Sequence, residues 1–233
     1  MPDFANDTGV CLTFDDNYIL EWFSALKSFK KYKAKATFFV SHFDKLSGSE
    51  LDMLKEIESH GHEIGYHTIS HFKPTDFLAK YSIEEYVKHE IFPGLELMSS
   101  AGFEPRSFAF PYNDSTCELQ TKLLELFDIL RLRADVLFEA LYKKNVNNKI
   151  LRAQNIDLHT NSSSPEIKFR ILDDIVEEFR IASKRDKIIA TYAHGISNRV
   201  VHHPHISLWG LEYLLHCAHE IGLSFYKASE LTI

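Results

Sequence analysis

The sequence lacks the features that mark several classes of protein. Its 233 residues contain no apolar run near 18 residues long, so no membrane-spanning helix is expected. Acidic residues outnumber basic ones, 33 to 26, and the net charge of −7 provides no basic surface for nucleic acid or an anionic membrane. The first ten residues have no basic patch followed by an apolar stretch, so we expect no signal peptide and a cytoplasmic location.

Cysteine is also scarce. The three cysteines, Cys11, Cys117 and Cys217, lie far apart in the sequence and form no CxxC pair. Zinc sites built from cysteine need local pairs, so we interpret all three as buried free thiols. No period of 20 to 50 residues repeats, which argues against a solenoid.

The sequence does contain regularly alternating strand and helix patterns. Apolar residues make up 45% of the chain, enough for a substantial core. Short apolar runs predict strands at 10–14, 36–40, 107–110, 128–131, 150–153, 188–192 and 224–227. Helical spacing predicts helices at 18–32, 51–57, 82–101, 115–127, 165–184 and 206–221, with a kink or break at Pro93 and a loop at 161–165. This alternation favours an α/β fold with a parallel sheet, and seven or eight strands fit a barrel better than an open sheet.

Two groups of polar residues directly follow predicted strands. Asp15 and Asp16 follow the first strand, and His67 and His71 follow the stretch EIGY. In a barrel, segments just past the strand ends form the active face, so both groups are expected on one rim. Two imidazoles and one carboxylate could bind a catalytic metal, which leaves the second carboxylate free to act as a base. Taken alone, an Asp–Asp pair is more often a turn or helix cap, and an HxxxH pair is often a surface feature.

Four motifs narrow these alternatives. The stretches LTFDDN, GHEIGYHTISH, FAFPY and TYAHGI occur in the order and spacing of the polysaccharide deacetylase family, carbohydrate esterase family 4. The sequence resembles this family over nearly its whole length, from Val10 to Leu231. The resemblance implies a distorted, TIM-like (β/α) barrel of seven or eight strands, with residues 1–233 forming a single catalytic domain.

The resemblance also implies roles for individual residues. Asp15 matches the general base, and His194 matches the general acid that protonates the leaving amine. Pro111 and Tyr112 match a motif in which the backbone N–H of Tyr112 binds the oxyanion. The metal ligands would be Asp16, His67 and His71, and the ion a divalent metal, zinc first, with cobalt, nickel or manganese as alternatives.

The sequence departs from the family pattern at three positions. Asn17 and Asn113 replace glycines, and Ser107 stands where an arginine often orients the base. Arg106 is one residue away, on the opposite face of its strand, so we do not expect it to replace that arginine. The remaining candidates for this role are Arg131, Arg133 and Arg152. For a carboxylate partner of His194 the candidates are Asp135 and Asp157.

The expected function is metal-dependent hydrolysis of the acetamide of an N-acetylated sugar, glycan or other small molecule. Two alternatives remain: hydrolysis of a non-sugar amide or cyclic imide on the same scaffold, and a carbohydrate-binding protein that has lost catalysis. The histidine-rich stretch 202–205 is interpreted as a solvated loop, with substrate contact or a second metal as the alternatives. The sequence does not indicate an oligomeric state.

Overall fold

The structure is a computed structural model that describes residues 7–143, 149–158, 165–199 and 201–231, with the side chains of α8 described from residue 172 onward. Among these residues, no helix is both long enough and apolar enough to cross a membrane. The predicted loop at 161–165 falls mostly outside the described residues, since the description resumes at Pro165.

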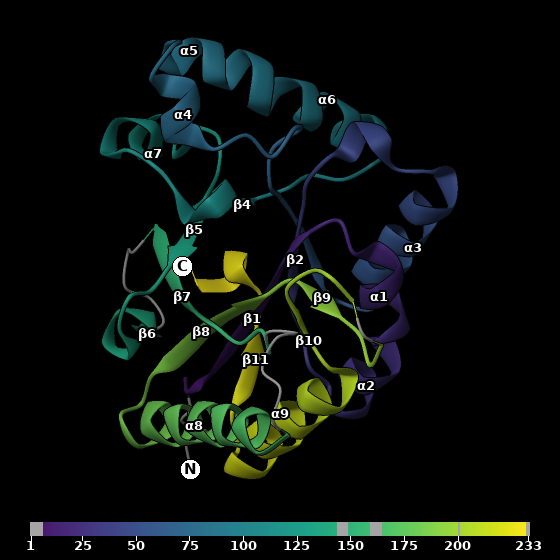
Figure 1. Ribbon diagram of the computed structural model, residues 1–233, viewed down its shortest axis with the longest axis vertical. Helices are drawn as coiled ribbons and strands as arrows, with labels where there is room; N and C mark the ends of the chain where they lie inside the picture. The colour runs from purple at the N-terminus through teal and green to yellow at the C-terminus, as the bar shows by residue number, and fades with distance from the viewer. Residues whose placement is uncertain (1–6, 144–148, 159–164, 200, 232–233) are drawn as a thin grey trace, which may run out of the picture.

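Seven parallel strands form a closed barrel, as the sequence predicted (Figure 1). Each strand pairs with the next, and the last pairs with the first over Gly9–Phe14 and Ile188–Ala193, which closes the ring. In order they are β1 (Gly9–Asp16), β2 (Thr37–Val40), β3 (Glu63–Tyr66), β4 (Ser107–Ala109), β5 (Ile129–Arg133), β7 (Ile150–Asn155) and β8 (Ile188–Ala193).

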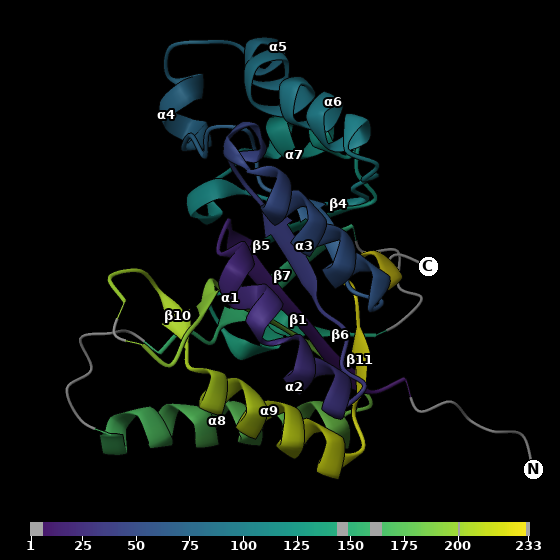
Figure 2. The same ribbon diagram turned by 90° about the vertical axis from the view of Figure 1, so that its right-hand side faces the viewer.

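Helices cover the outside of this barrel. Figures 1 and 2 show α4 to α6 at one end of the long axis and the adjacent pair α8 and α9 at the other. The helices are α1 (Ile19–Ser24), α2 (Leu26–Lys31), α3 (Gly48–Ser59), α4 (Pro74–Leu78), α5 (Ile83–Tyr86), α6 (Phe92–Ser100), α7 (Cys117–Leu123), α8 (Pro165–Lys184) and α9 (Leu208–Ile221).

The barrel is irregular between β5 and β7. In the described part of this connection, the 3-10 turn η4 (Leu137–Ala140) and the short strand β6 (Leu141–Tyr142) stand where a helix would complete the pattern. Strand β6 pairs antiparallel with the start of β8. The remaining short elements are the 3-10 turns η1 (Phe43–Lys45) and η3 (Pro111–Asn113), and the strands β9 (Gly195–Ile196) and β10 (His205–Ile206).

Two predicted helices are interrupted, one of them at an unexpected position. The helix predicted over 18–32 is divided at Ala25 into α1 and α2. The helix predicted over 82–101 is divided by a π-helical turn, η2 (Val87–Ile91), just before Pro93, where the sequence predicted a kink or break. Ser82 begins this segment with a capping box to Glu85.

Alternate residues of each strand point into the barrel or towards the helices, which gives two apolar clusters. The larger cluster lies between strands and helices, and the smaller one fills the barrel interior with residues such as Cys11, Phe39 and Ala109. The prediction of three buried cysteines is correct only for Cys11, because Cys117 is exposed and Cys217 is half-buried. Both of the latter lie on covering helices, whose outer faces contact solvent.

The last part of the chain closes the end of the barrel at which the strands begin, called the lower end below. Strand β11 (Ser224–Tyr226) pairs with the lower half of β1, and the 3-10 turn η5 (Ala228–Leu231) follows. The buried Glu63 carboxylate holds this end together: it accepts hydrogen bonds from the hydroxyls of Thr37 (2.9 Å) and Ser107 (2.8 Å) and from the Ser229 backbone N–H (3.1 Å).

Candidate active site

The upper end of the barrel collects polar side chains from several strands. Asp15 is the penultimate residue of β1 and faces inward, and Arg131 occupies an inward position of β5. His67 and His194 follow β3 and β8 directly, so they continue the inward-facing rows of those strands. The closed barrel therefore brings together residues separated by as many as 179 positions in the sequence, at its carboxyl end, where barrel active sites lie.

Asp16, His67 and His71 form a cluster of three metal-donor groups. The Nε2 atom of His71 lies 3.1 Å from the Nε2 atom of His67 and 3.3 Å from Oδ1 of Asp16. The third separation, between His67 Nε2 and Asp16 Oδ1, is 3.6 Å. Zinc–nitrogen bonds of 2.0–2.1 Å in a tetrahedron would place ligand atoms about 3.3–3.4 Å apart. The three atoms thus fit the ligand spacing of one small divalent ion.

The protonation of these histidines also suits a metal. The Nδ1 atom of His67 lies 2.8 Å from the carbonyl oxygen of Ala109, so Nδ1 carries the proton and Nε2 presents a lone pair to the cluster. Burial lowers the pKa of His67 well below its usual range, and the nearby His71 lowers it further. The pKa of His71 is also lowered, chiefly by burial, although Asp16 and Asp15 oppose that shift. Two neutral imidazole rings and one carboxylate present the unprotonated donor atoms that metal binding requires.

Left-handed backbone geometry aims several of these side chains. Asp16 has φ of 82°, which turns its side chain into the site although it follows the inward-facing Asp15 directly. Thr68, His71, Tyr112 and Asn113 have φ between 54° and 66°. Five of the eight non-glycine residues with positive φ among the described residues therefore lie at this site. Such residues are held against an intrinsic cost of about 1–3 kcal/mol each, and they concentrate at functional sites.

Asp15 is held by Arg131 and is not one of the three clustered donors. Arg131 donates from Nη2 to Asp15 Oδ2 and from Nη1 to the side-chain oxygen of Asn113. Arg131 is fully buried and packs between the rings of Phe39 and Tyr192, with its guanidinium carbon 5.6 and 4.9 Å from the two ring centroids. The other Asp15 oxygen, Oδ1, is buried and has no hydrogen-bond partner among the described residues. One carboxylate oxygen is thus fixed, and the other is free to accept a proton.

The other candidate arginines lie elsewhere. Arg106 bonds Asp128 at 2.7 Å near the lower ends of β4 and β5 and is 61% exposed, as expected from its position in the strand. Arg133 is exposed and lies 3.8 Å from Asp135, and Arg152 donates to the Arg133 carbonyl. Sequence reasoning left these candidates unranked. Arg131 and Arg133 share one face of β5, but only Arg131 is flanked by apolar residues within the strand and buried, whereas Arg133 ends the strand and is exposed.

His194 and Asp157 form a partly buried pair just past the ends of the neighbouring strands β8 and β7. The Nδ1 atom of His194 lies 2.6 Å from Asp157 Oδ2, and the His194 backbone N–H donates to Asp157 Oδ1 at 3.0 Å. Burial on its own lowers the pKa of His194. The hydrogen bond to Asp157 and the negative charges of Asp15, Asp157 and Asp16 outweigh it, and the pKa is raised to about 9. His194 is therefore protonated near neutral pH. Of the two predicted partners, Asp157 pairs with it and the exposed Asp135 does not.

The Pro111–Tyr112 pair borders the metal-donor cluster. Both lie in η3, and the ring of Tyr112 is 4.8 Å from the ring of His71. Tyr112 is 64% exposed, so its ring forms an open edge of the site. The predicted role of its backbone N–H in oxyanion binding stays a prediction.

Two of the three histidines in 202–205, His203 and His205, have local partners. The ring of His203 stacks on Tyr18 at 4.0 Å and lies 3.3 Å from Glu21. The ring of His205 is buried, and its Nδ1 lies 3.0 Å from the His203 carbonyl oxygen. Among the described residues, no second cluster of three metal donors includes these histidines. The solvated-loop interpretation therefore fits His202 but not His205.

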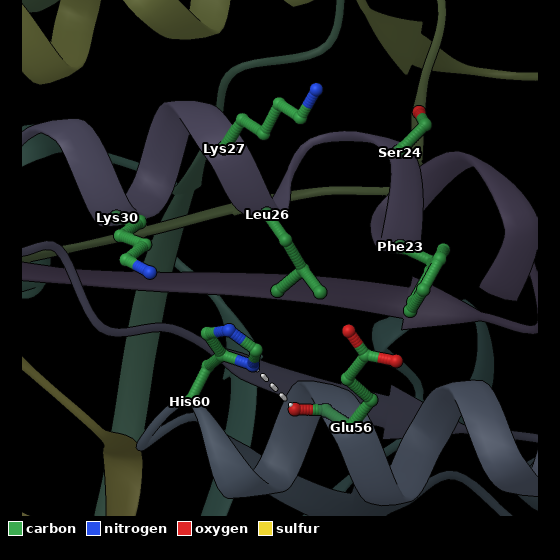
Figure 3. A pocket seen from close by; sticks show the side chains of 7 residues that line it. All are labelled: Phe23, Ser24, Leu26, Lys27, Lys30, Glu56 and His60. Carbon is green, nitrogen blue, oxygen red and sulfur yellow. Dashed lines mark hydrogen bonds between the residues drawn. The ribbon is translucent and has the colours of Figure 1, made fainter.

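A separate cavity of about 320 Å³ lies outside the barrel (Figure 3). The residues that line it are Phe23, Ser24, Leu26, Lys27, Lys30, Glu56 and His60. Figure 3 shows Lys30 and Glu56 on opposite sides of Leu26, with His60 bonded to the Glu56 carbonyl. Because α3 ends here, just before β3 begins, the cavity lies at the other end of β3 from His67. It takes no part in the candidate site.

Comparison with known proteins identifies the family. The model of the polysaccharide deacetylase family matches residues 5–126, a little over half of the chain. The chain belongs to the polysaccharide deacetylase family. The matched range includes Asp15, Asp16, His67, His71 and Tyr112, whereas Arg131, Asp157 and His194 lie beyond it and are joined to the site by the fold.

Individual relatives agree with this assignment. A peptidoglycan-N-acetylglucosamine deacetylase of Bacillus cereus is 35% identical over 113 residues, which are 47% of this chain but only 38% of that protein. The chitin deacetylase of Colletotrichum lindemuthianum has a TM-score of 0.65 at 18% identity, covering 95% of this chain and 86% of that one. The peptidoglycan deacetylase PdaC of Bacillus subtilis has a TM-score of 0.62 at 19% identity, covering 97% and 90%. These structural likenesses establish the shared fold.

Proposed function

We propose that the protein is a divalent-metal-dependent hydrolase that removes the acetyl group from an N-acetylated sugar or glycan. The observation that carries this proposal is the placement of Asp15. One of its oxygens is held by buried Arg131 and the other has no partner among the described residues, beside a three-donor cluster that fits a metal. The names of the relatives, which are deacetylases of peptidoglycan and chitin, support an N-acetylated carbohydrate as the substrate.

Asp16, His67 and His71 would hold the ion, and zinc is the metal we propose, with cobalt, nickel or manganese as substitutes. The bound ion would polarise the acetamide carbonyl and lower the pKa of a coordinated water. Nitrogen and carboxylate donors bind all of these metals, so availability decides which one is bound.

The residues of this chain perform the proton transfers. Asp15 accepts a proton from the attacking water at its free Oδ1 atom, and Arg131 keeps the carboxylate oriented. His194 is protonated before reaction and donates a proton from Nε2 to the leaving nitrogen, while Asp157 holds the ring through Nδ1. The Tyr112 backbone N–H donates to the oxygen that gains negative charge.

Two alternative functions remain from the sequence. A protein that binds carbohydrate without catalysis would not need a buried arginine on a free carboxylate or an acidic partner for His194, and both are present. Hydrolysis of another amide or a cyclic imide uses the same groups, because the fold does not determine the substrate.

A substrate panel distinguishes these functions. Acetate release from N-acetylglucosamine oligomers and from peptidoglycan would be measured beside ring opening of cyclic imides. We expect acetate release from the sugars and none above background from a His67→Ala, His71→Ala double variant. Ring opening without acetate release would contradict the proposed substrate, and activity on neither would contradict the proposed reaction.

A further inference from the structure

The segment that follows the metal-donor loop contains an uncommon helical turn. Residues Val87–Ile91 form a π-helical turn between α5 and α6. Such turns are rare in proteins, and those that occur are often found at functional sites. Glu90 lies within this turn and is 5% exposed, although it carries a carboxylate. A buried carboxylate needs hydrogen-bond donors, and these donors come from the loop between the two histidines.

The hydroxyl of Tyr66 explains the wide turn. It donates to the Glu90 carbonyl at 2.6 Å and faces the Gly94 backbone N–H, so it occupies the place of the direct Gly94-to-Glu90 helical bond. Only glycine fits at position 94, because a Cβ there would overlap the Tyr66 hydroxyl. The Glu90 carbonyl also accepts from the Ile69 N–H at 3.1 Å. The helix thus contacts the loop through its backbone.

The Glu90 side chain adds two further bonds to the same loop. Its carboxylate accepts from the Ser70 hydroxyl and, at 3.2 Å, from the Ser70 backbone N–H. The next residue is His71, whose N–H donates to the Thr68 hydroxyl at 2.9 Å. Every residue between the two histidines is therefore anchored, and Glu90 holds two of the three.

The two histidines differ in how they are aimed. The ring of His67 is fixed at Nδ1 by the Ala109 carbonyl. Among the described residues, Nδ1 of His71 has no hydrogen-bond partner, so its direction is set by its backbone, which is left-handed at φ of 55°. This conformation is intrinsically unfavourable and persists only where the surroundings enforce it.

We propose that Glu90 is a positioning residue that aims His71 at the metal and thereby sets the affinity of the site. Its side chain acts through Ser70, and its backbone carbonyl, which the substitutions leave in place, holds Ile69. Glu90 does not belong to the metal-donor cluster or to the groups proposed to transfer protons. This inference rests on the metal site of the proposed function. Groups that orient metal ligands typically contribute 10- to 100-fold to metal affinity.

The test compares Glu90 with a matched buried carboxylate. Glu63 accepts three hydrogen bonds at the opposite end of the barrel, so Glu63→Ala should cost comparable stability without touching the loop. Zinc dissociation constants would be measured against a chelating fluorophore, with thermal unfolding of the metal-free proteins as the stability reference. The variants are Glu90→Ala, Glu90→Gln, Ser70→Ala and Glu63→Ala.

We expect Glu90→Ala to weaken zinc binding by about 10- to 100-fold. Glu90→Gln, which keeps an acceptor oxygen, should recover part of the loss, and Glu63→Ala should change affinity less than about threefold. With cobalt bound, the visible absorption bands should shift in Glu90→Ala and not in Glu63→Ala. If Glu90→Ala does not fold, Ser70→Ala and Glu90→Gln test the same contacts.

Two other outcomes have distinct meanings. Unchanged affinity in folded Glu90 variants, or equal losses in the Glu90 and Glu63 variants, would overturn the positioning role and leave the metal site intact. A wild-type protein that binds no divalent metal would overturn the metal site itself, and this inference with it.

Discussion

At the scale of single residues, the site depends on two neighbouring aspartates with different surroundings. Asp15 is 2% exposed and bonded to Arg131, whereas the Asp16 side chain is 21% exposed and lies beside the two histidines. The left-handed backbone at Asp16 makes this possible, because adjacent strand residues otherwise point to opposite faces. These surroundings suit Asp15 to accept a proton and Asp16 to bind the metal.

This division predicts opposite effects of matched substitutions. Asp15→Asn should keep bound metal and lose about 10²- to 10⁴-fold in kcat, the range for a missing general base. Asp16→Asn should lose the metal. Metal analysis of both purified variants beside their acetate-release rates checks this. A metal-free Asp15→Asn protein would show that the two roles are exchanged.

Arg131 provides a second prediction at this scale. Arg131→Lys keeps a positive charge but cannot bond Asp15 and Asn113 together, so kcat/KM should fall about 10- to 100-fold with metal retained. The control is Arg106→Ala, which removes an exposed ion pair with Asp128 and should change kcat/KM less than about threefold. A larger loss in the Arg106 variant than in the Arg131 variant would contradict our placement of the base's partner.

The pair of His194 and Asp157 predicts a pH effect. Asp157 raises the pKa of His194 to about 9, so the acid form, and with it kcat/KM, should decline as the pH rises through that value. Asp157→Asn removes the raising interaction, so the pKa falls and the alkaline limb of the pH–rate profile should move to lower pH. Activated aryl acetates need little acid assistance and should be affected least. A limb that stays in place would exclude His194 as the group that titrates.

At the scale of elements, the strands were predictable from the sequence and the turns were not. Apolar runs located β1, β5 and β8 because strand residues in a closed barrel are buried on both faces. Pro93 indicated a break in the helix predicted over 82–101, but no periodic signal marked the break at Ala25 or the π-helical form of the turn, which depends on a contact with a distant residue. The hydroxyl of Tyr66 bonds to the Glu90 carbonyl of the helix from a strand more than twenty residues earlier.

The close approach of Tyr66 to Gly94 gives a prediction for the helix. Gly94→Ala should displace the π-helical turn and destabilise the fold by about 1–3 kcal/mol, the usual cost of an added group in a packed site. Gly48→Ala is the matched control, because a methyl group at this position, at the start of α3, would have no described atom within 4 Å. Thermal unfolding of both variants measures the difference. Equal stability would mean that the helix accommodates the methyl group without cost.

At the scale of the whole molecule, barrel closure explains which site residues the sequence could identify. Asp15, Asp16, His67 and His71 were identifiable because their motifs lie at or just past strand ends and resemble those of the family. The choice of Arg131 over Arg133 and Arg152, and of Asp157 over Asp135, required the register between β4, β5, β7 and β8. Register is set by long-range packing, so local patterns left those choices open.

The most direct test of this account is a zinc titration of metal-free protein that follows acetate release from N-acetylglucosamine oligomers. We expect one zinc ion per chain to bind and to restore activity, and the His67→Ala, His71→Ala double variant to show neither binding nor activity. Full metal occupancy in the double variant, or undiminished acetate release from metal-free protein, would contradict it.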